Sequence, residues 1–163
     1  MAKQSLGRFS EKGRQLQKIL IEFLNDEYFV KLIHNKNKSP ITTALPVNFD
    51  NYSLLNTKLY TQVYRPPTDV ESVYVCVFYK KGGIGGNNTY YKNSDITVAI
   101  IVHRDLWEIE GGLRAFDIAD RVDYILNRNN VTESLSNDWF KGFRYYPVDD
   151  FYGVIELDYS NWD

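Results

Sequence analysis

The sequence predicts an α+β domain in which two main helices pack on a mostly antiparallel sheet that contains a long β-hairpin. Residues 72–79 (SVYVCVFY) and 95–104 (DITVAIIVHR) are rich in β-branched and aromatic residues, which favour strands, and a glycine-rich stretch separates them. Apolar residues at steps of three and four in residues 10–33 and 113–126 predict the helices. The order of helix, weak strand, hairpin, helix and hairpin is typical of this fold class.

The N-terminal part is expected to be a short arm followed by helical structure. Residues 1–9 hold few apolar groups and are expected to form a flexible N-terminal arm. Ser10 can serve as the N-cap of the helix, which Asn25 and Asp26 kink or end. A second apolar cluster at residues 29–33 follows, and a polar stretch that ends in a proline then stops the helical pattern.

The middle of the chain is expected to be irregular before the sheet begins. Residues 41–58 contain a proline and three asparagines that break any period, and residues 59–64 predict a short strand that ends at two prolines. Every residue from 73 to 79 is apolar or aromatic, which predicts a strand covered on both faces. Residues 80–93 (KKGGIGGNNTYYKN) are too long for a tight turn and are expected to form a flexible hairpin loop.

The C-terminal third predicts an amphipathic helix and a closing hairpin. Apolar residues recur at helical spacing on one side of the helix, at Leu113, Phe116, Ala119, Val122 and Leu126. Charged residues fall on the other side, at Arg114, Asp117, Asp120, Arg121 and Asp123. The arginines are expected to neutralise the aspartates. Asp117 and Arg121 are four residues apart, and we expect a weak salt bridge between them that stabilises the helix by about 0.3–0.5 kcal/mol. Residues 140–146 and 152–159 predict the two closing strands.

Length and composition favour one domain that spans residues 1–163. The apolar fraction of 44% and the aromatic fraction of 15% argue against intrinsic disorder. A net charge of −2 excludes a protein that coats polyanions along its whole surface, although residues 1–38 hold eight basic against four acidic side chains. Cys76 is the only cysteine, which excludes an internal disulfide and a thiolate zinc site. No secretory signal and no membrane span is expected.

No motif predicts catalysis, a cofactor or a metal site, so an enzyme is not expected. The glycine cluster at residues 82–86 lacks the lysine and the following helix of a P-loop. His34 and His103 are the only histidines, and two histidines without cysteine partners are too few for zinc.

One enzymatic alternative stays open. Asp149, Asp150, Glu156 and Asp158 resemble the acidic pairs of metal-dependent nucleases, although Asp158 stands where such a motif requires lysine. Glu156 and Asp158 are two residues apart and share one face of a strand, which is also ordinary for the solvated face of a sheet.

The order of elements resembles a family of virion proteins. The resemblance rests on five segments in this order: LQKILIEFLNDEYFVKLIH, a Tyr-Arg-Pro-Pro segment, a strand pair around a glycine-rich tip, NSDITVAIIVHRDLWEIEGGLRAFDIADRVDYIL, and a closing hairpin that ends in YGVIELDY. Over residues 10–160 the chain is similar to the small neck and tail-completion proteins of tailed bacteriophages, the tail-terminator and head–tail connector group.

This resemblance implies a structural virion protein that is assembled in the host cytoplasm. Members form rings, often hexameric, that contact neighbouring proteins of the neck, connector or tail tube. The expected assembly or lumen site is the hairpin loop with Lys80, Lys81, Tyr90, Tyr91 and Lys92, whose lysines would line a passage for DNA. A non-catalytic protein-binding module of a cellular machine remains the second interpretation.

Overall fold

The computed structural model describes residues 8–84, 92–128 and 139–162. The helices in these ranges are α1 (Arg8–Leu24), α2 (Glu27–His34) and α3 (Arg114–Arg128), with the 3₁₀ helices η1 (Asn51–Leu54) and η2 (Arg104–Leu106). The strands are β1 (Leu59–Tyr60), β2 (Val73–Ile84), β3 (Lys92–His103), β4 (Glu108–Ile109), β5 (Gly112–Leu113), β6 (Trp139–Pro147) and β7 (Tyr152–Trp162). None of the described helices is long and apolar enough to cross a membrane.

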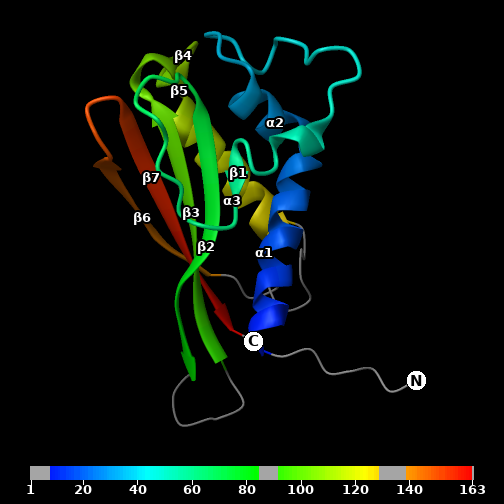
Figure 1. The fold of residues 1–163 in the computed structure, drawn as a ribbon, viewed down its shortest axis with the longest axis vertical. Coiled ribbons are helices and arrows are strands. Elements are labelled where there is room, and N and C mark those ends of the chain that lie inside the picture. The colour runs from blue at the N-terminus through cyan, green and yellow to red at the C-terminus, as the bar shows by residue number, and fades with distance from the viewer. Residues whose placement is uncertain (1–7, 85–91, 129–138, 163) are drawn as a thin grey trace.

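Five strands form the main sheet, in the order β1-β2-β3-β7-β6, and β4 pairs with β5 in a small separate hairpin. Neighbours in the main sheet are antiparallel except β1 and β2, which are parallel. In Figure 1 the helices lie to one side of this sheet, and α1 packs against β2 while α3 packs against β3 and β7. The structure therefore confirms the predicted α+β fold, with one more helix because the N-terminal helical segment is divided.

That division occurs at Asp26. The side chain of Asp26 accepts a hydrogen bond from the Phe29 N–H at 2.8 Å and caps α2, so the expected end of the first helix is confirmed. The expected start is wrong, because α1 begins at Arg8 and Ser10 lies within its first turn. Only residues 1–7 of the expected arm lie outside the described residues.

The long β-hairpin is formed by β2 and β3, and its strands extend further than expected. β2 continues to Ile84 and β3 begins at Lys92, so the expected loop of residues 80–93 is wrong at both ends, and its centre at 85–91 lies outside the described residues. The ladder continues through polar and glycine residues because backbone hydrogen bonds hold an antiparallel pair together. The weak strand before the hairpin shrinks to Leu59–Tyr60.

The predicted apolar side of helix α3 is confirmed at Val122 and Leu126 but wrong at Phe116. Its fully buried apolar side chains are Ala115, Ile118, Val122, Ile125 and Leu126. Phe116, expected on the apolar side, is 42% exposed, whereas Arg114, expected on the solvated side, is 1% exposed. Backbone carbonyl groups draw the Arg114 guanidinium inward, and this contact sets the rotation of the helix.

Successive residues of the strands alternate between two chemically different faces. The helix face of β2 carries Val73, Val75 and Val77, which join the main core with the apolar sides of all three α-helices. The open face carries Tyr74, Cys76 and Phe78, in a cluster to which no described α-helix contributes. The prediction that this strand is covered on both faces is confirmed, but by different material on each side.

Candidate assembly surfaces: the open face and the free edge strand

Of the five residues expected at the assembly loop, only Lys80 has a described side chain. Lys81 and Lys92 are paired residues of β2 and β3, and their side chains lie outside what the structure describes. Tyr90 and Tyr91 lie outside the described residues altogether. The expected site is therefore described only at its base.

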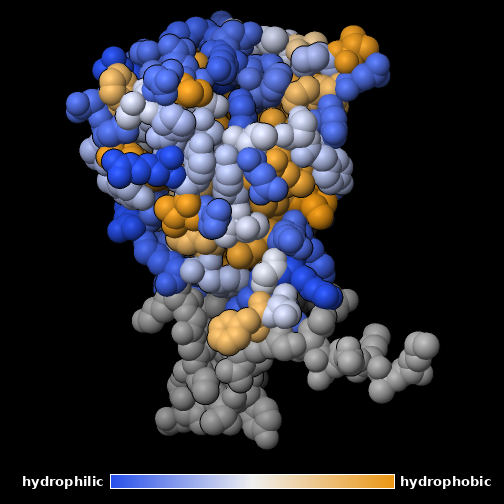
Figure 2. Space-filling model, viewed as in Figure 1, coloured by the Kyte–Doolittle hydropathy of each residue, from blue (hydrophilic) through white to orange (hydrophobic). Residues whose placement is uncertain are grey.

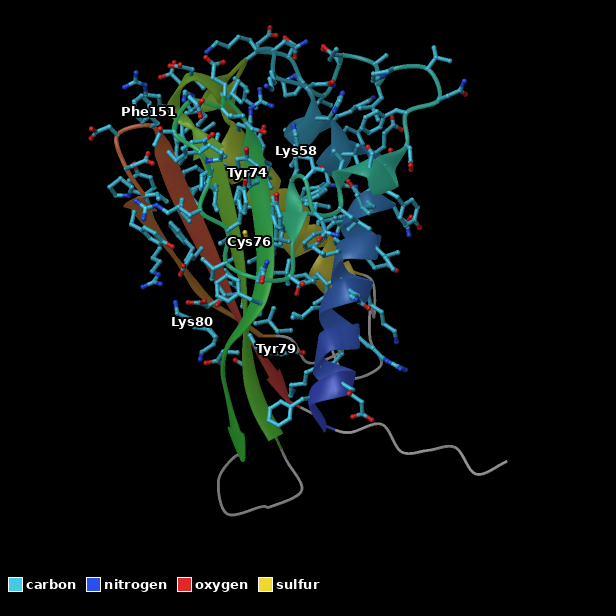
Figure 3. The ribbon with its side chains drawn as sticks, in the orientation of Figure 1. Lys58, Tyr74, Cys76, Tyr79, Lys80 and Phe151 are labelled. Carbon is cyan, nitrogen blue, oxygen red and sulfur yellow. The ribbon has the colours of Figure 1, made fainter. Side chains whose placement is uncertain are left out.

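The side chain of Lys80 points to the open face, whereas its neighbour Tyr79 points toward α1 (Figure 3). Lys80 Nζ lies 3.1 Å from Glu156 Oε2, and Arg144 Nε donates to the same oxygen at 2.6 Å. The Tyr146 hydroxyl donates to the other oxygen, Oε1, at 2.6 Å. These contacts join β2, β6 and β7 across the open face.

The carboxylate at the centre of this group is charged although it is buried. The Glu156 side chain is 5% exposed, and burial alone would raise its pKa. Hydrogen bonds from Tyr146, Lys80 and Arg144 outweigh the burial and hold the pKa of Glu156 below its ordinary value. The half-exposed Lys80 and Arg144 carry the matching charge toward solvent.

Two of the other three carboxylates of the nuclease alternative have partners of their own, whereas Asp150 is exposed in the turn between β6 and β7. Asp158 accepts a hydrogen bond from Thr97 Oγ1 at 2.7 Å on the open face. Asp149 Oδ1 accepts one from the Phe151 N–H at 2.8 Å in the turn between β6 and β7. With Glu156 held by two cations, each of these three carboxylates stabilises a different local contact.

Tyrosines cover the upper half of the open face. Tyr60 and Tyr64 stack with ring centroids 4.2 Å apart and planes 7° apart, and Tyr64 lies 4.8 Å from Tyr74. The Tyr152 hydroxyl donates to the carbonyl oxygen of Val70. Burial and the hydrogen bond with Tyr64 raise the pKa of Tyr60 to about 12. The rings therefore form a neutral aromatic layer that takes the place of a helix on this side.

A hollow of about 430 Å³ lies between this layer and the Glu156 group. Buried Cys76, Ala99 and Val154 line it, together with Tyr64 and Glu156. Figure 3 shows Cys76 midway along β2. Burial raises the pKa of the Cys76 thiol to about 11, so the thiol is neutral and the hollow has an apolar lining with a charged lower end.

The free edge strand β6 presents a second surface, on the helix face. Phe140, Phe143 and Tyr145 are 50%, 59% and 58% exposed, and each lies opposite a buried β7 residue of the main core. Phe116 of α3 meets Phe143 edge-on with ring centroids 6.1 Å apart. We call Phe116, Phe140, Phe143 and Tyr145 the aromatic ledge.

Trp107 closes the upper end of the aromatic ledge. Its ring lies 5.7 Å from that of Tyr145 and packs over Gly153 of β7. A Cβ atom at Gly153 would come within 2.8 Å of the Trp107 ring, so glycine is required for this close approach. A hollow of about 630 Å³ adjoins Trp107 and Tyr145 at the turn between β6 and β7.

Two cations hold the C-terminal end of α2. The Arg114 guanidinium donates at 2.7–2.8 Å to the carbonyl oxygens of Leu106, Leu32, Asn35 and Asn37. Lys58 Nζ donates to the Ile33 carbonyl oxygen at 2.9 Å, and burial, with the charges of Lys36 and Arg114, lowers the pKa of Lys58 to about 8. The last carbonyl groups of a helix lack partners within the helix, so these contacts complete it.

Arg121 pairs with Asp26 and not, as predicted, with Asp117. Its Nε and Nη2 atoms reach the two Asp26 carboxylate oxygens at 2.8 and 2.5 Å, which ties α3 to the N-cap of α2. Arg114 donates to backbone carbonyl groups and Arg121 pairs with Asp26, so the predicted pairing of these arginines with the aspartates of α3 is wrong. Burial and the nearby charge of Asp120 raise the pKa of Asp117, which reflects the acidic character of this side of α3.

His103 lies beside two carboxylates. Each of Glu71, His103 and Asp105 offers one potential metal-ligand atom, and these three atoms lie within 4.8 Å of one another. Nδ1 of the buried His103 accepts a hydrogen bond from the Asp105 N–H at 3.2 Å, and both carboxylates are exposed. Glu71 could not be recognised from the sequence, because most of the β2–β3 hairpin separates it from His103 along the chain.

The aromatic ledge and the buried arginine are the features that sequence reasoning missed. Phe143 and Tyr145 are two residues apart, but Phe140 and Phe143 are three apart, which breaks the alternation of a regular strand. A bulge between Phe140 and Gly142 absorbs the extra residue, and its recognition would have placed the three rings on one face. Arg114 had no such signal, because its acceptors are backbone atoms of distant segments.

Comparison with known proteins adds one finding. No curated protein matches the chain. The family described as YomW matches residues 26–161, which run from the N-cap of α2 into β7 and include the whole main sheet. The name has the form given to phage genes and points to a phage-associated protein. Because this match covers most of the chain, the protein belongs to the phage-associated YomW family.

Proposed function

We propose that this protein is a structural component of a phage particle, and that its copies form a ring at the head–tail junction that terminates the tail or connects it to the head. The observation that carries this proposal is the aromatic ledge on a free edge strand. Four half-exposed rings of 150–250 Å² each leave about 400 Å² of aromatic surface. Patches of this size on a monomer are often interaction sites, and membership of a phage-associated family supports a virion partner.

The two edges of the main sheet also favour assembly. Among the described strands, β6 has a neighbour on one side only, and β1 pairs with just Val75 and Cys76 of β2. Along the rest of β2 down to Ile84, one edge has no strand neighbour among the described residues. Open edges offer backbone donors and acceptors to another chain. Because the two edges lie at opposite ends of the sheet, each copy can contact two neighbours, as a ring requires.

In this proposal the β2–β3 hairpin contacts a neighbouring virion protein or the lumen through which DNA passes. Figure 1 shows the described parts of both strands extending beyond the body of the sheet. Lys80 lies at the base of this extension and is half-exposed. Lys81, Tyr90, Tyr91 and Lys92 remain proposed contact residues.

Size-exclusion chromatography with light scattering tests the proposal. We expect the purified full-length chain to form a discrete ring, either alone or when mixed with the tail-tube or connector protein of the same phage. Electron microscopy of that species gives the copy number. A chain that stays monomeric at high concentration in both settings contradicts the proposal, and a monomer that binds one defined peptide favours the protein-binding module.

The proposal assigns no bond-breaking step, which a DNA-cleavage assay checks. Incubation of the protein with plasmid DNA and Mg²⁺ or Mn²⁺ is expected to leave the DNA intact. Cleavage by the wild type that is lost in both Glu156→Gln and Asp158→Asn would favour the nuclease alternative.

A further inference from the structure

We propose that the aromatic ledge binds helix α1 of a second copy of this chain, so that each copy meets its neighbours through two different surfaces. This inference rests on the proposed function and names the surfaces that would join the ring. Four observations carry it: an incomplete helix layer, an exposed stripe on α1, opposite charge on the two surfaces, and their positions at opposite flanks of the sheet.

In the part of the chain that the structure describes, the helix layer on the main sheet ends at α3, before it reaches β6. α1 packs against β2, and α3 packs against β3 and β7. β6 extends the sheet past α3, which leaves Phe140, Phe143 and Tyr145 half-exposed on the face that the helices cover elsewhere. A further helix beside α3 would cover these rings and complete the second layer of the domain.

Helix α1 has an exposed stripe suited to that position. Its inner side holds it to its own sheet through Leu16, Ile19, Leu20, Phe23 and Leu24. On its outer side Arg14, Lys18 and Ile21 follow one another at steps of four and three and so lie on one stripe. The 17 residues of α1 span about 25 Å. The nine residues of β6 span about 30 Å, so the helix can follow the ledge along its length.

The two surfaces carry opposite charge. Arg14 and Lys18 outnumber Glu11, which lies one turn before Arg14 on the same stripe, so the stripe on α1 has a net positive charge. On α3, exposed Asp120 lies one turn after Phe116, at the border of the ledge. The two cations of β6 bind carboxylates on the open face, and so do not oppose a basic helix on the helix face.

Hydropathy agrees with two separate surfaces and not with one large patch. In Figure 2 hydrophobic side chains gather toward the middle of the visible face, while its upper end is mostly hydrophilic. The aromatic ledge leaves about 400 Å² of aromatic surface, which is about half of the roughly 800 Å² per partner of a standard interface. Contacts beside the ledge must supply the remainder.

The positions of the two surfaces require a head-to-tail contact. Figure 1 shows α1 and β6 at opposite sides of the molecule. A head-to-tail contact forms a ring when its rotation closes.

Mixing two variants tests this arrangement. Phe143→Asp damages the ledge and leaves α1 intact, whereas Arg14→Glu with Lys18→Glu damages the stripe and leaves the ledge intact. We expect each variant alone to be monomeric under conditions in which the wild type assembles. An equimolar mixture is expected to form a one-to-one dimer and nothing larger, because only one intact interface can form. Light scattering gives the mass, and circular dichroism checks that both variants are folded.

Controls separate this inference from the proposed function. Val47→Asp changes an apolar residue that is 92% exposed in the loop between α2 and η1, and is expected to assemble like the wild type. A wild type that assembles while Phe143→Asp or the α1 variant also assembles overturns the inference and leaves the proposed function standing. A mixture of the two that stays monomeric overturns it as well. A wild type that never assembles, even with tail-tube or connector protein, contradicts the proposed function itself.

Charge exchange gives a second readout. Asp120→Lys is expected to weaken assembly of the wild type at least tenfold in dissociation constant at low salt. Combined in one chain with Arg14→Glu and Lys18→Glu, it is expected to recover most of that loss. No recovery would contradict the pairing of α1 with the border of the ledge.

Discussion

The two faces of the main sheet use the same strands for different purposes. On the helix face β2 contributes three valines to a core of aliphatic side chains that three helices seal. On the open face it contributes Tyr74, Cys76 and Phe78 to a smaller cluster in which tyrosines and a buried glutamate take part. The helix face thus holds most of the apolar burial that stabilises the fold.

The difference shows how one sheet can support a closed core and still present contact surfaces. On the helix face, the part of the sheet beside α3 that no described helix covers is the aromatic ledge. On the open face, tyrosine hydroxyls and ion pairs provide the partners of the buried polar side chains. We therefore expect substitutions on the helix face to unfold the protein, whereas substitutions on the open face change stability less. The predictions below test that gradient, from the largest effect to the smallest.

The largest effect is expected at Val75, which is fully buried at the centre of the helix face. Val75→Asp places a carboxylate among aliphatic side chains without a partner, and should lower the free energy of unfolding by about 4 kcal/mol or more. Urea denaturation followed by circular dichroism measures the loss. Val63→Asp is the matched control, since Val63 is 73% exposed and should change stability by less than about 0.5 kcal/mol. Equal losses at both positions would contradict the assignment of the core.

The next effect is expected at Arg114, beneath the same layer of helices. Arg114→Met leaves four carbonyl groups, two of them buried, without this donor, and should cost about 3 kcal/mol. Arg114→Lys should recover only part of this, because an ammonium group cannot reproduce the planar guanidinium fork. Thermal unfolding of the two variants beside Arg104→Met, at an exposed arginine, measures the difference. A loss at Arg104 as large as that at Arg114 would show that the carbonyl contacts are not the cause.

Arg114 also shows why part of the structure could not be predicted from sequence. The strands and helices were predictable because their apolar patterns reflect burial along a single element. The exact side of α3 that faces inward was not, because the spacing that fits Leu113 and Phe116 also fits Ala115 and Ile118 two residues along. Backbone acceptors in α2 and in the following loop decide between them, and backbone atoms leave no trace in a sequence.

The candidate surfaces divide in the same way. The basic residues of the hairpin stand out in sequence because charge and glycine content are local properties. The Glu156 group depends on three strands that meet only in the folded sheet, and the aromatic ledge depends on a bulge in β6. Local composition can thus suggest that a segment is exposed, but which side chains meet there is set by pairing between distant strands.

A smaller effect is expected at Glu156 on the open face. Glu156→Gln keeps the shape but removes the charge that Lys80 and Arg144 share, and should cost about 2 kcal/mol at neutral pH. The folded-state pKa of Glu156 is lowered, so its contribution is present above about pH 4.5, the unfolded value, and is lost as the pH falls through the folded pKa. Urea denaturation at pH 7 and at pH 3 should show the gap between wild type and variant closing. A gap that is constant with pH would contradict a charged Glu156.

The smallest effect is expected at Cys76, in the lining of the hollow on the same face. Cys76→Ala removes one buried heavy atom and should cost about 1 kcal/mol at pH 7. The native thiol pKa of about 11 lies above the unfolded value of about 9, so the folded state holds its proton longer, and the advantage of the wild type should shrink as the pH rises from 9 to 11. The native thiol should also react with a maleimide far more slowly than the thiol of the urea-unfolded chain. Rapid labelling of the native protein would show that tyrosines do not seal the open face, and the contrast between the two faces would then be one between a closed core and an accessible groove.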